Sequence, residues 1–246
     1  MPNKNLDHVE RFEIAFNQIH SLLKEFSKNI KTDRFVDLLQ ENRGKYGVLN
    51  ANYYKLKQYA KLRNAIVHER IDDQYYIAEP HLDVVEDIEQ ISKILQNPPK
   101  AISIASQPVV FFRQDSSLLK ILETIEEHGY SQFPIYEGDH FKGLLTEGGI
   151  AKWFSKHIRD MSVSLKGVTA NDILEDEKLR NVACLSNDQT IYDVEEAFQN
   201  HYEKQQKLEA VLITEDGNQD SAPKGIISSW DLVKIEHSSI SLLSNS

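Results

Sequence analysis

Apolar side chains recur every three or four positions through the first hundred residues, as they do in helices that bury one face. Capping and turn residues divide this pattern into four helices. We expect these helices over residues 6–30, 32–43, 50–68 and 80–95, with Pro80 at the first position of the last one. Four helices joined by short loops predict an antiparallel four-helix bundle.

The pattern changes beyond residue 100 and then occurs twice. Residues 108–154 and 181–235 each contain a short strand, a polar turn with an aspartate, an amphipathic helix, two more strands, the second led by glycine, and a closing helix. Two copies are too few for a solenoid, so we expect them to pair about a pseudo-two-fold axis. Such a pair leaves two related clefts in which a small molecule would bind. The loop over residues 215–224 is rich in turn residues, and we expect it to be exposed and mobile.

The fold class is therefore α+β, and the distribution of charge indicates where the two parts meet. Residues 1–100 contain 15 Lys and Arg against 15 Asp and Glu, so the whole net charge of −10 falls on the rest of the chain. Two prolines, Pro98 and Pro99, lie at this change and stiffen the connection. We expect a helical domain over 1–97, a linker over 98–101, paired motifs over 102–160 and 168–236, and a flexible tail over 237–246.

The composition sets two further limits. The single cysteine, Cys184, excludes an internal disulfide framework and a cysteine-rich zinc site, and its place in a strand-like run favours a buried apolar role. No apolar run approaches the length of a membrane span, and the N-terminus has no apolar signal core. We therefore expect a cytoplasmic protein without membrane contact.

The helix predicted over residues 50–68 ends with side chains that suit RNA cleavage. Asn64 and His68 are four residues apart and share a face, and Arg63 can curl towards them. A guanidinium binds phosphate in a bidentate fork, an imidazole moves protons near neutral pH, and an amide orients either group. Together these groups suit attack by a ribose 2′-hydroxyl on its own phosphate, with no metal.

The stretch from Arg63 to His68 resembles the Arg-polar-x-x-x-His motif of HEPN domains, helical bundles that often dimerise and often cleave RNA. The resemblance covers roughly residues 5–97 and implies a metal-independent endoribonuclease with Arg63, Asn64 and His68 as catalytic residues. A related branch of HEPN toxins has a tyrosine where this chain has Arg70, so the resemblance to that branch fails. The alternative is a dimer-interface or capping role for these residues in an inactive relative.

RNA binding is also indicated by the segment from Arg43 to His68, which we call the basic segment. It contains six Lys and Arg residues, four tyrosines and no acid. Cations can follow a nucleic-acid backbone while rings stack on its bases. The alternative is a solvated basic helix face with tyrosines at its surface.

In the second half, the runs GYSQFPIY, GLLT and GIISSWDL resemble CBS (cystathionine-β-synthase) motifs, and the pair resembles one Bateman module. The resemblance covers about residues 102–236. It implies a β-α-β-β-α unit in each copy and an adenine nucleotide bound between the copies, without chemistry on that ligand. AMP, ADP, ATP and cyclic di-AMP all fit. The run GYSQFPIY resembles small bacterial CBS proteins that bind cyclic di-AMP, and this resemblance slightly favours that ligand.

The same resemblance assigns roles to residues of both copies. Asp231 would accept the ribose hydroxyls, and Ser228 would hold phosphate together with a helix N-terminus. The base would lie against the first copy. The full set of nucleotide-binding candidates is Val110, Tyr130, Ser131, Phe133, Thr146, Ile226, Ser228 and Asp231. The alternatives are a helix cap for Asp231 and core packing for Tyr130.

The two clefts are not expected to be equal, because Gly149 falls where Asp231 stands in the second copy. Loss of a charge-assisted hydrogen bond costs about 1.5–3 kcal/mol, so one site should dominate. Taken together, the two resemblances predict a homodimer in which a nucleotide sensor controls a helical effector. The rival interpretation is a non-enzymatic adaptor whose helical domain binds partners. A nucleotide-hydrolysing enzyme is disfavoured, since no phosphate-binding glycine loop is present.

Overall fold

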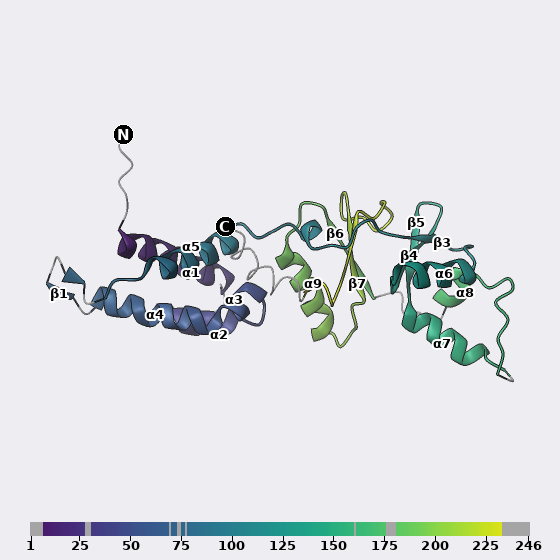
Figure 1. The fold of residues 1–246 in the computed structure, drawn as a ribbon, viewed down its shortest axis with the longest axis horizontal. Coiled ribbons are helices and arrows are strands. Elements are labelled where there is room, and N and C mark those ends of the chain that lie inside the picture. Colours follow the sequence, from purple (N-terminus) through teal and green to yellow (C-terminus); the bar gives the residue numbers. More distant parts are fainter. Residues whose placement is uncertain are drawn as a thin grey trace. The chain divides into compact units, whose positions relative to one another are not determined.

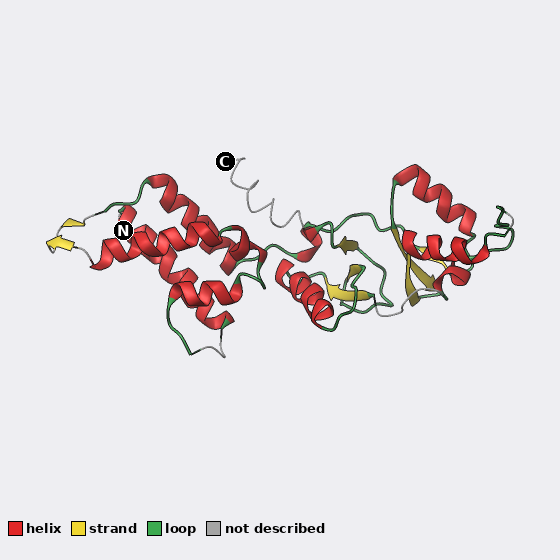
Figure 2. Cartoon of the chain, turned by 90° about the horizontal axis from the view of Figure 1, so that it is seen from below, coloured by secondary structure: helices red, strands yellow, loops and turns green. Residues whose placement is uncertain are grey.

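The computed structural model describes residues 7–27, 31–68, 70–72, 75–76, 78–159, 161–175 and 181–232. The expected tail over 237–246 and the end of the second motif lie outside these residues. The chain divides into two compact units, with the break between Pro99 and Lys100 (Figure 1). Helices make up most of the first unit, whereas the second combines helices with two small sheets (Figure 2).

The first unit contains the predicted helices with three changes. Its elements are α1 (His8–Phe26), α2 (Phe35–Asn42), α3 (Gly47–Ala51), α4 (Tyr53–His68), β1 (Arg70–Asp72), β2 (Tyr75–Tyr76) and α5 (Leu82–Gln96). The helix predicted over 50–68 is interrupted at Asn52, whose side-chain amide donates to the Val48 carbonyl at 2.9 Å. The β1–β2 hairpin was not predicted, and α5 begins after His81, so Pro80 is not its first residue.

The core of the first unit lies between α1 and the helices that surround it. The rings of Phe16 and Phe35 stack with centroids 4.4 Å apart, and Tyr59 meets Phe12 edge-on at 5.9 Å. Burial of these apolar stripes explains why the periodic pattern predicts the helices correctly. The largest fully buried side chains of this core are Phe12, Ile19, Leu23, Leu38, Leu39, Leu49, Leu56, Ile66 and Ile88.

The predicted antiparallel order is wrong for the first and last helices. Arg11 of α1 contacts Glu89, whereas Gln18, two turns later, contacts Ser92 and Gln96, so α1 and α5 run in the same direction. The reversal expected between α1 and α2 takes place in the loop instead. There Asp33 contacts His20 and Lys24, and the chain has returned along α1 before α2 begins.

The contact between α1 and α5 predicts a pH dependence. Arg11 donates from Nε and Nη2 to the two oxygens of Glu89, at 2.9 and 2.7 Å, and these bonds lower the pKa of Glu89. A lowered pKa in the folded state stabilises the fold above the unfolded value of about 4.3, and this stabilisation is lost as the pH falls further. Below about pH 4 we expect the melting temperature to fall more steeply in the wild type than in Glu89→Gln. If the melting temperature falls equally steeply with pH in the wild type and in Glu89→Gln, the assignment to Glu89 is contradicted. It is also contradicted if the exposed control Glu25→Gln makes this fall as shallow as Glu89→Gln does.

The second unit contains two sheets with the same strand order. The first consists of β3 (Phe112–Arg113), β4 (Gln132–Glu137) and β5 (His140–Thr146), and the second of β6 (Val182–Ser186), β7 (Ala210–Thr214) and β8 (Gly225–Ser228). In each sheet the first two strands are parallel and the last two antiparallel. The parallel pairs are bridged by α6 (Leu118–His128) and α9 (Ile191–Glu203), as a crossover requires. The predicted β-α-β-β order is confirmed in both copies. The closing helix of the first copy is α7 (Glu147–His157).

Each repeat is completed by the chain segment that precedes the other one. The 3₁₀ turn η1 (Ala101–Ser103) packs into the core of the second repeat, and α8 (Ala170–Leu174) packs into the core of the first. The two contacts match, because Ala101 donates to the Gln189 carbonyl and Ala170 to the Ser116 carbonyl, both at 2.9 Å. The sequence repeat did not predict this exchange, since both segments lie ahead of the repeated pattern.

Candidate functional site

Asp231 lies three residues after the end of β8 and is buried, with 6% of its surface exposed. Its carboxylate oxygen Oδ2 accepts from the backbone N–H and from the hydroxyl of Ser228, each at 2.8 Å. The cap geometry that was considered as an alternative is therefore present. It also holds the carboxylate in one place, beside the Ser228 hydroxyl, at the end of the strand. The helix expected after Asp231 lies outside the described residues beyond Leu232.

The equivalent position of the first copy has no carboxylate. Thr146 ends β5, and its hydroxyl oxygen accepts from the backbone N–H of Gly149 at 3.0 Å, which caps α7. Thr146 thus occupies the place of Ser228, and Gly149 the place of Asp231. The two copies present the same backbone path with different chemistry at its end.

The first-copy candidates lie in different environments. Val110 is half-buried against the core of the first repeat. Tyr130 is 37% exposed and stacks on His128 with centroids 5.4 Å apart, so it does not belong to the core. Ser131 is exposed, and its carbonyl accepts from Glu147 at 3.1 Å.

Two candidates are already engaged within the fold. Phe133 has no exposed surface and packs in the first core beside Phe112, with centroids 5.3 Å apart. Ile226 is half-buried, and its N–H and carbonyl both bond to Ser106. Phe133 and Ile226 can therefore support the backbone around a binding site, but their apolar side chains offer no hydrogen bond to a ligand.

A bond between the copies brings the two sets of candidates together. The side chain of Gln132, the residue after Ser131, donates to the carbonyl of Glu209 at 3.0 Å. The next residue, Ala210, pairs with Ser228 across β7 and β8. Ser131, which directly precedes β4, therefore lies near the Ser228 end of the second sheet.

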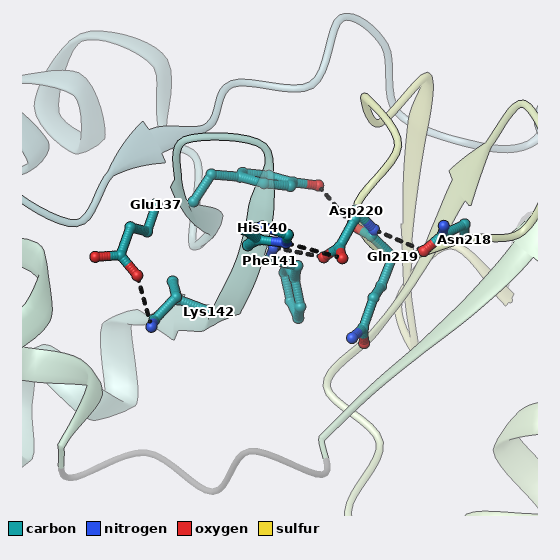
Figure 3. Close-up of polar contacts among 8 residues, drawn as sticks. Glu137, His140, Phe141, Lys142, Asn218, Gln219 and Asp220 are labelled. Carbon is teal, nitrogen blue, oxygen red and sulfur yellow. Dashed lines mark hydrogen bonds and ion pairs between the residues drawn. The ribbon is translucent and has the colours of Figure 1, made fainter.

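A second contact between the copies involves the loop over residues 215–224 (Figure 3). The carboxylate of Asp220 accepts from the backbone N–H of Phe141 at 2.8 Å and lies 3.2 Å from Nδ1 of His140. These two partners lower the pKa of Asp220. The hydroxyl of Tyr136 donates to the Gln219 carbonyl at 3.4 Å. The loop was expected to be mobile, but it is anchored to the β4–β5 hairpin of the other copy.

Cys184 lies half-buried in β6. Burial, with a smaller contribution from the charge of Asp220, raises the pKa of its thiol to about 11. A thiol of this pKa stays protonated at neutral pH and is a poor nucleophile. The residue therefore behaves as a small apolar strand residue, in agreement with the sequence.

The Arg63–His68 motif lies at the end of α4. Arg63 is half-buried and Asn64 is exposed, whereas the side chain of His68 lies outside the described residues. A histidine from another helix, His20 of α1, is close enough to Arg63 to be influenced by its charge. Its pKa is lowered mainly by burial, with smaller contributions from the charges of Lys24 and Arg63. No local pattern could indicate this neighbour, since it lies 43 residues from Arg63.

Most of the basic segment is tied into the helical packing. Tyr46 stacks on Phe26 with centroids 4.3 Å apart, and the hydroxyl of Tyr59 donates to Asp87 at 2.7 Å. Lys55 forms an ion pair with the same carboxylate, also at 2.7 Å. Around Tyr53, the cations of Arg43 and Lys57 lie 4.5 and 5.3 Å from the ring centroid. The fourth tyrosine, Tyr54, is 77% exposed and has the most surface for stacking on a base.

In the ranges that the structure describes, no helix is both long enough and apolar enough to cross a membrane. In the same ranges, no group of three or more His, Cys, Asp or Glu side chains is arranged to hold a metal ion.

Several solved CBS structures are similar to this chain. One is a CBS domain pair in complex with 5′-methylthioadenosine and S-adenosyl-L-methionine, at 19% identity, with 57% of this chain and 98% of that chain covered and a TM-score of 0.43. A putative signal-transduction protein with CBS domains from Burkholderia ambifaria MC40-6 has 17% identity, coverages of 55% and 92%, and a TM-score of 0.41. The CBS domain of a bacterial CNNM/CorC family Mg²⁺ transporter in complex with ATP has 18% identity, coverages of 61% and 93%, and a TM-score of 0.41.

By sequence, a shorter part of the chain matches a known family. No curated protein matches the chain. Residues 101–156 match the family model described as CBS domain, and this match spans η1, the first sheet and most of α7. The match to the CBS domain model thus covers the first copy, and a repeat with the same strand order follows it.

Proposed function

We propose that the second unit binds an adenine nucleotide and that this ligand regulates the helical unit. The observation that carries the proposal is the bond from Gln132 to Glu209, because it joins the two halves of the candidate site. Tyr130 and Ser131 precede Gln132, and Ser228 pairs with the residue after Glu209. This bond supports a site in which the groups proposed for the base lie near those proposed for the ribose and phosphate.

The chemistry of these groups favours a nucleotide. A fixed carboxylate at Asp231 accepts the two ribose hydroxyls. The Ser228 hydroxyl, which donates to Oδ2 of Asp231 in this structure, would turn to donate to the phosphate when the ligand binds. Backbone groups around Tyr130 and Ser131 can read the adenine edge, and Val110 can cover its face. Thr146 would belong to a weaker site in the first copy. The candidate ligands are AMP, ADP, ATP and cyclic di-AMP, and the CBS match of residues 101–156 supports this class.

A thermal-shift screen tests the ligand class. A ligand that binds only the folded state stabilises it by about 2.7 kcal/mol at a hundred times its Kd. We expect at least one of the four adenine nucleotides to raise the melting temperature, and GMP and GTP, as matched controls, to raise it less. No shift with any adenine nucleotide, or equal shifts with the guanine nucleotides, would contradict the proposal.

For the helical unit we propose a metal-independent endoribonuclease that acts as a homodimer. Arg63 would bind the scissile phosphate, His68 would transfer the proton, and Asn64 would orient them. The basic segment would bind RNA with Tyr54 as its exposed ring. The second candidate is a non-enzymatic adaptor. It is favoured because the rings of Tyr53 and Tyr59 are buried and the Tyr46 ring already stacks on Phe26.

A further inference from the structure

We propose that strand β8 couples the nucleotide site to the chain segment that arrives from the helical unit. This inference rests on the nucleotide site proposed above. It concerns residues 100–107, which we call the entry segment, and their contacts within the second unit.

The entry segment begins directly after Pro99, yet it packs on the second repeat and not on the first. Ala101 is fully buried and donates to the Gln189 carbonyl at 2.9 Å, and Lys100 pairs with Thr190. The other apolar side chains of the segment pack against the second core: Ile102, Ile104 and Ala105. Only residues 97–99 separate this segment from the end of α5.

Ser106 links the entry segment to β8. Its N–H donates to the Ile226 carbonyl at 2.9 Å, and its own carbonyl accepts from the Ile226 N–H at 3.2 Å. Two residues further along the same strand, Ser228 donates to Asp231. A strand of four residues thus holds the entry segment at one end and the proposed ligand groups at the other.

Gly225 makes the approach of the two segments possible. A Cβ atom at Gly225 would lie 2.7 Å from Cβ of Ala105 and 2.9 Å from Cδ1 of Ile102. The Ile102 side chain can rotate away, but the Cβ of Ala105 is fixed to the backbone. Any side chain at position 225 therefore pushes the entry segment away from β8.

The coupling is possible in only one of the two repeats. The segment that packs on the first repeat, α8, connects the repeats to each other, whereas the entry segment connects them to the helical unit. The second repeat, which holds the entry segment, is also the one that has a carboxylate, Asp231. In the first repeat Gly149 takes that place, so a ligand there would lack this group.

Hydrogen–deuterium exchange on the full chain tests the coupling, with an equimolar mixture of AMP, ADP, ATP and cyclic di-AMP as the probe. In the wild type we expect the nucleotides to slow exchange in residues 100–107 and in α5, because coupling requires the ligand to favour one arrangement of both. In Gly225→Ala we expect thermal stabilisation by the nucleotides to persist and the slowing in α5 to be lost.

Two further variants complete this experiment. The double variant Gly225→Ala with Ala105→Gly removes the 2.7 Å contact and should restore the slowing in α5. The control Gly148→Ala adds a Cβ whose nearest contact is the Thr146 hydroxyl oxygen at 3.5 Å, and it should behave as the wild type. If Gly225→Ala does not fold, Ser106→Pro replaces it, since proline cannot donate to Ile226.

The outcomes separate the coupling from the nucleotide site. Stabilisation by nucleotides without any change of exchange in residues 100–107 and α5 would overturn the coupling and leave the site in place. Persistent slowing of α5 exchange in Gly225→Ala would overturn it as well. Absence of stabilisation in the wild type would overturn both proposals.

Discussion

Replacement of Asp231 by alanine is expected to weaken adenine-nucleotide binding about ten- to a hundredfold, because the ribose hydroxyls lose a charged acceptor worth about 1.5–3 kcal/mol. The variant also loses both bonds from Ser228, so its ligand-free form should melt a few degrees lower. Calorimetric titration measures the first effect and thermal unfolding the second.

Two variants separate these effects. Asp231→Asn keeps an oxygen that accepts from the Ser228 N–H, so it should melt closer to the wild type while binding the nucleotide more weakly. Glu126→Ala removes an exposed carboxylate from α6 and should change neither property. Unchanged affinity in Asp231→Ala would show that this carboxylate is only a cap.

Replacement of His68 by alanine is expected to reduce RNA cleavage by about a hundred- to ten-thousandfold, the usual contribution of a general acid or base. Arg63→Ala should cause a loss of similar size, because the phosphate loses its bidentate partner. The measurement is cleavage of mixed RNA by the pure full-length protein in EDTA, which removes metal-dependent nucleases from the readout.

The matched control is His81→Ala. His81 is exposed at the start of α5, and its side chain makes no capping bond. Equal cleavage by the wild type and His68→Ala would assign the activity to another group. No cleavage by the wild type would reject the ribonuclease and leave the adaptor as the function of the helical unit.

Local periodicity predicts the elements of this protein well, because burial of one helix face or one sheet face imposes its spacing on the sequence. The helices α1, α2 and α5 and the strand order of both repeats follow from that spacing. The repeat alone also aligns Gly149 with Asp231, each three residues after the last residue of β5 or β8.

Contacts between distant segments have no such local signal. The direction of α2 depends on a loop that returns along α1 through Asp33, which a pattern of apolar positions does not record. Asp87 neutralises Lys55 from 32 residues away, so the charge of the basic segment is overestimated from its own composition. The exchange of η1 and α8 between the repeats likewise depends on bonds between residues far apart in the chain.

In the candidate site too, the sequence indicates local relations between residues but not the contacts between distant segments. The sequence places Ser228 and Asp231 three residues apart, at the spacing of a first helical turn, and the structure joins them by two bonds. It does not reveal that Phe133 is fully buried or that Ile226 is bonded to Ser106, because both facts depend on packing between separate segments.

Calorimetric titration of the full chain with AMP, ADP, ATP and cyclic di-AMP tests the central claim most directly. The two copies differ at Asp231 and Gly149, so the account predicts one dominant site per chain for at least one of these nucleotides. It also predicts that this site is weakened in Asp231→Ala. Absence of binding heat with all four nucleotides, or two equal sites that persist in Asp231→Ala, would contradict it.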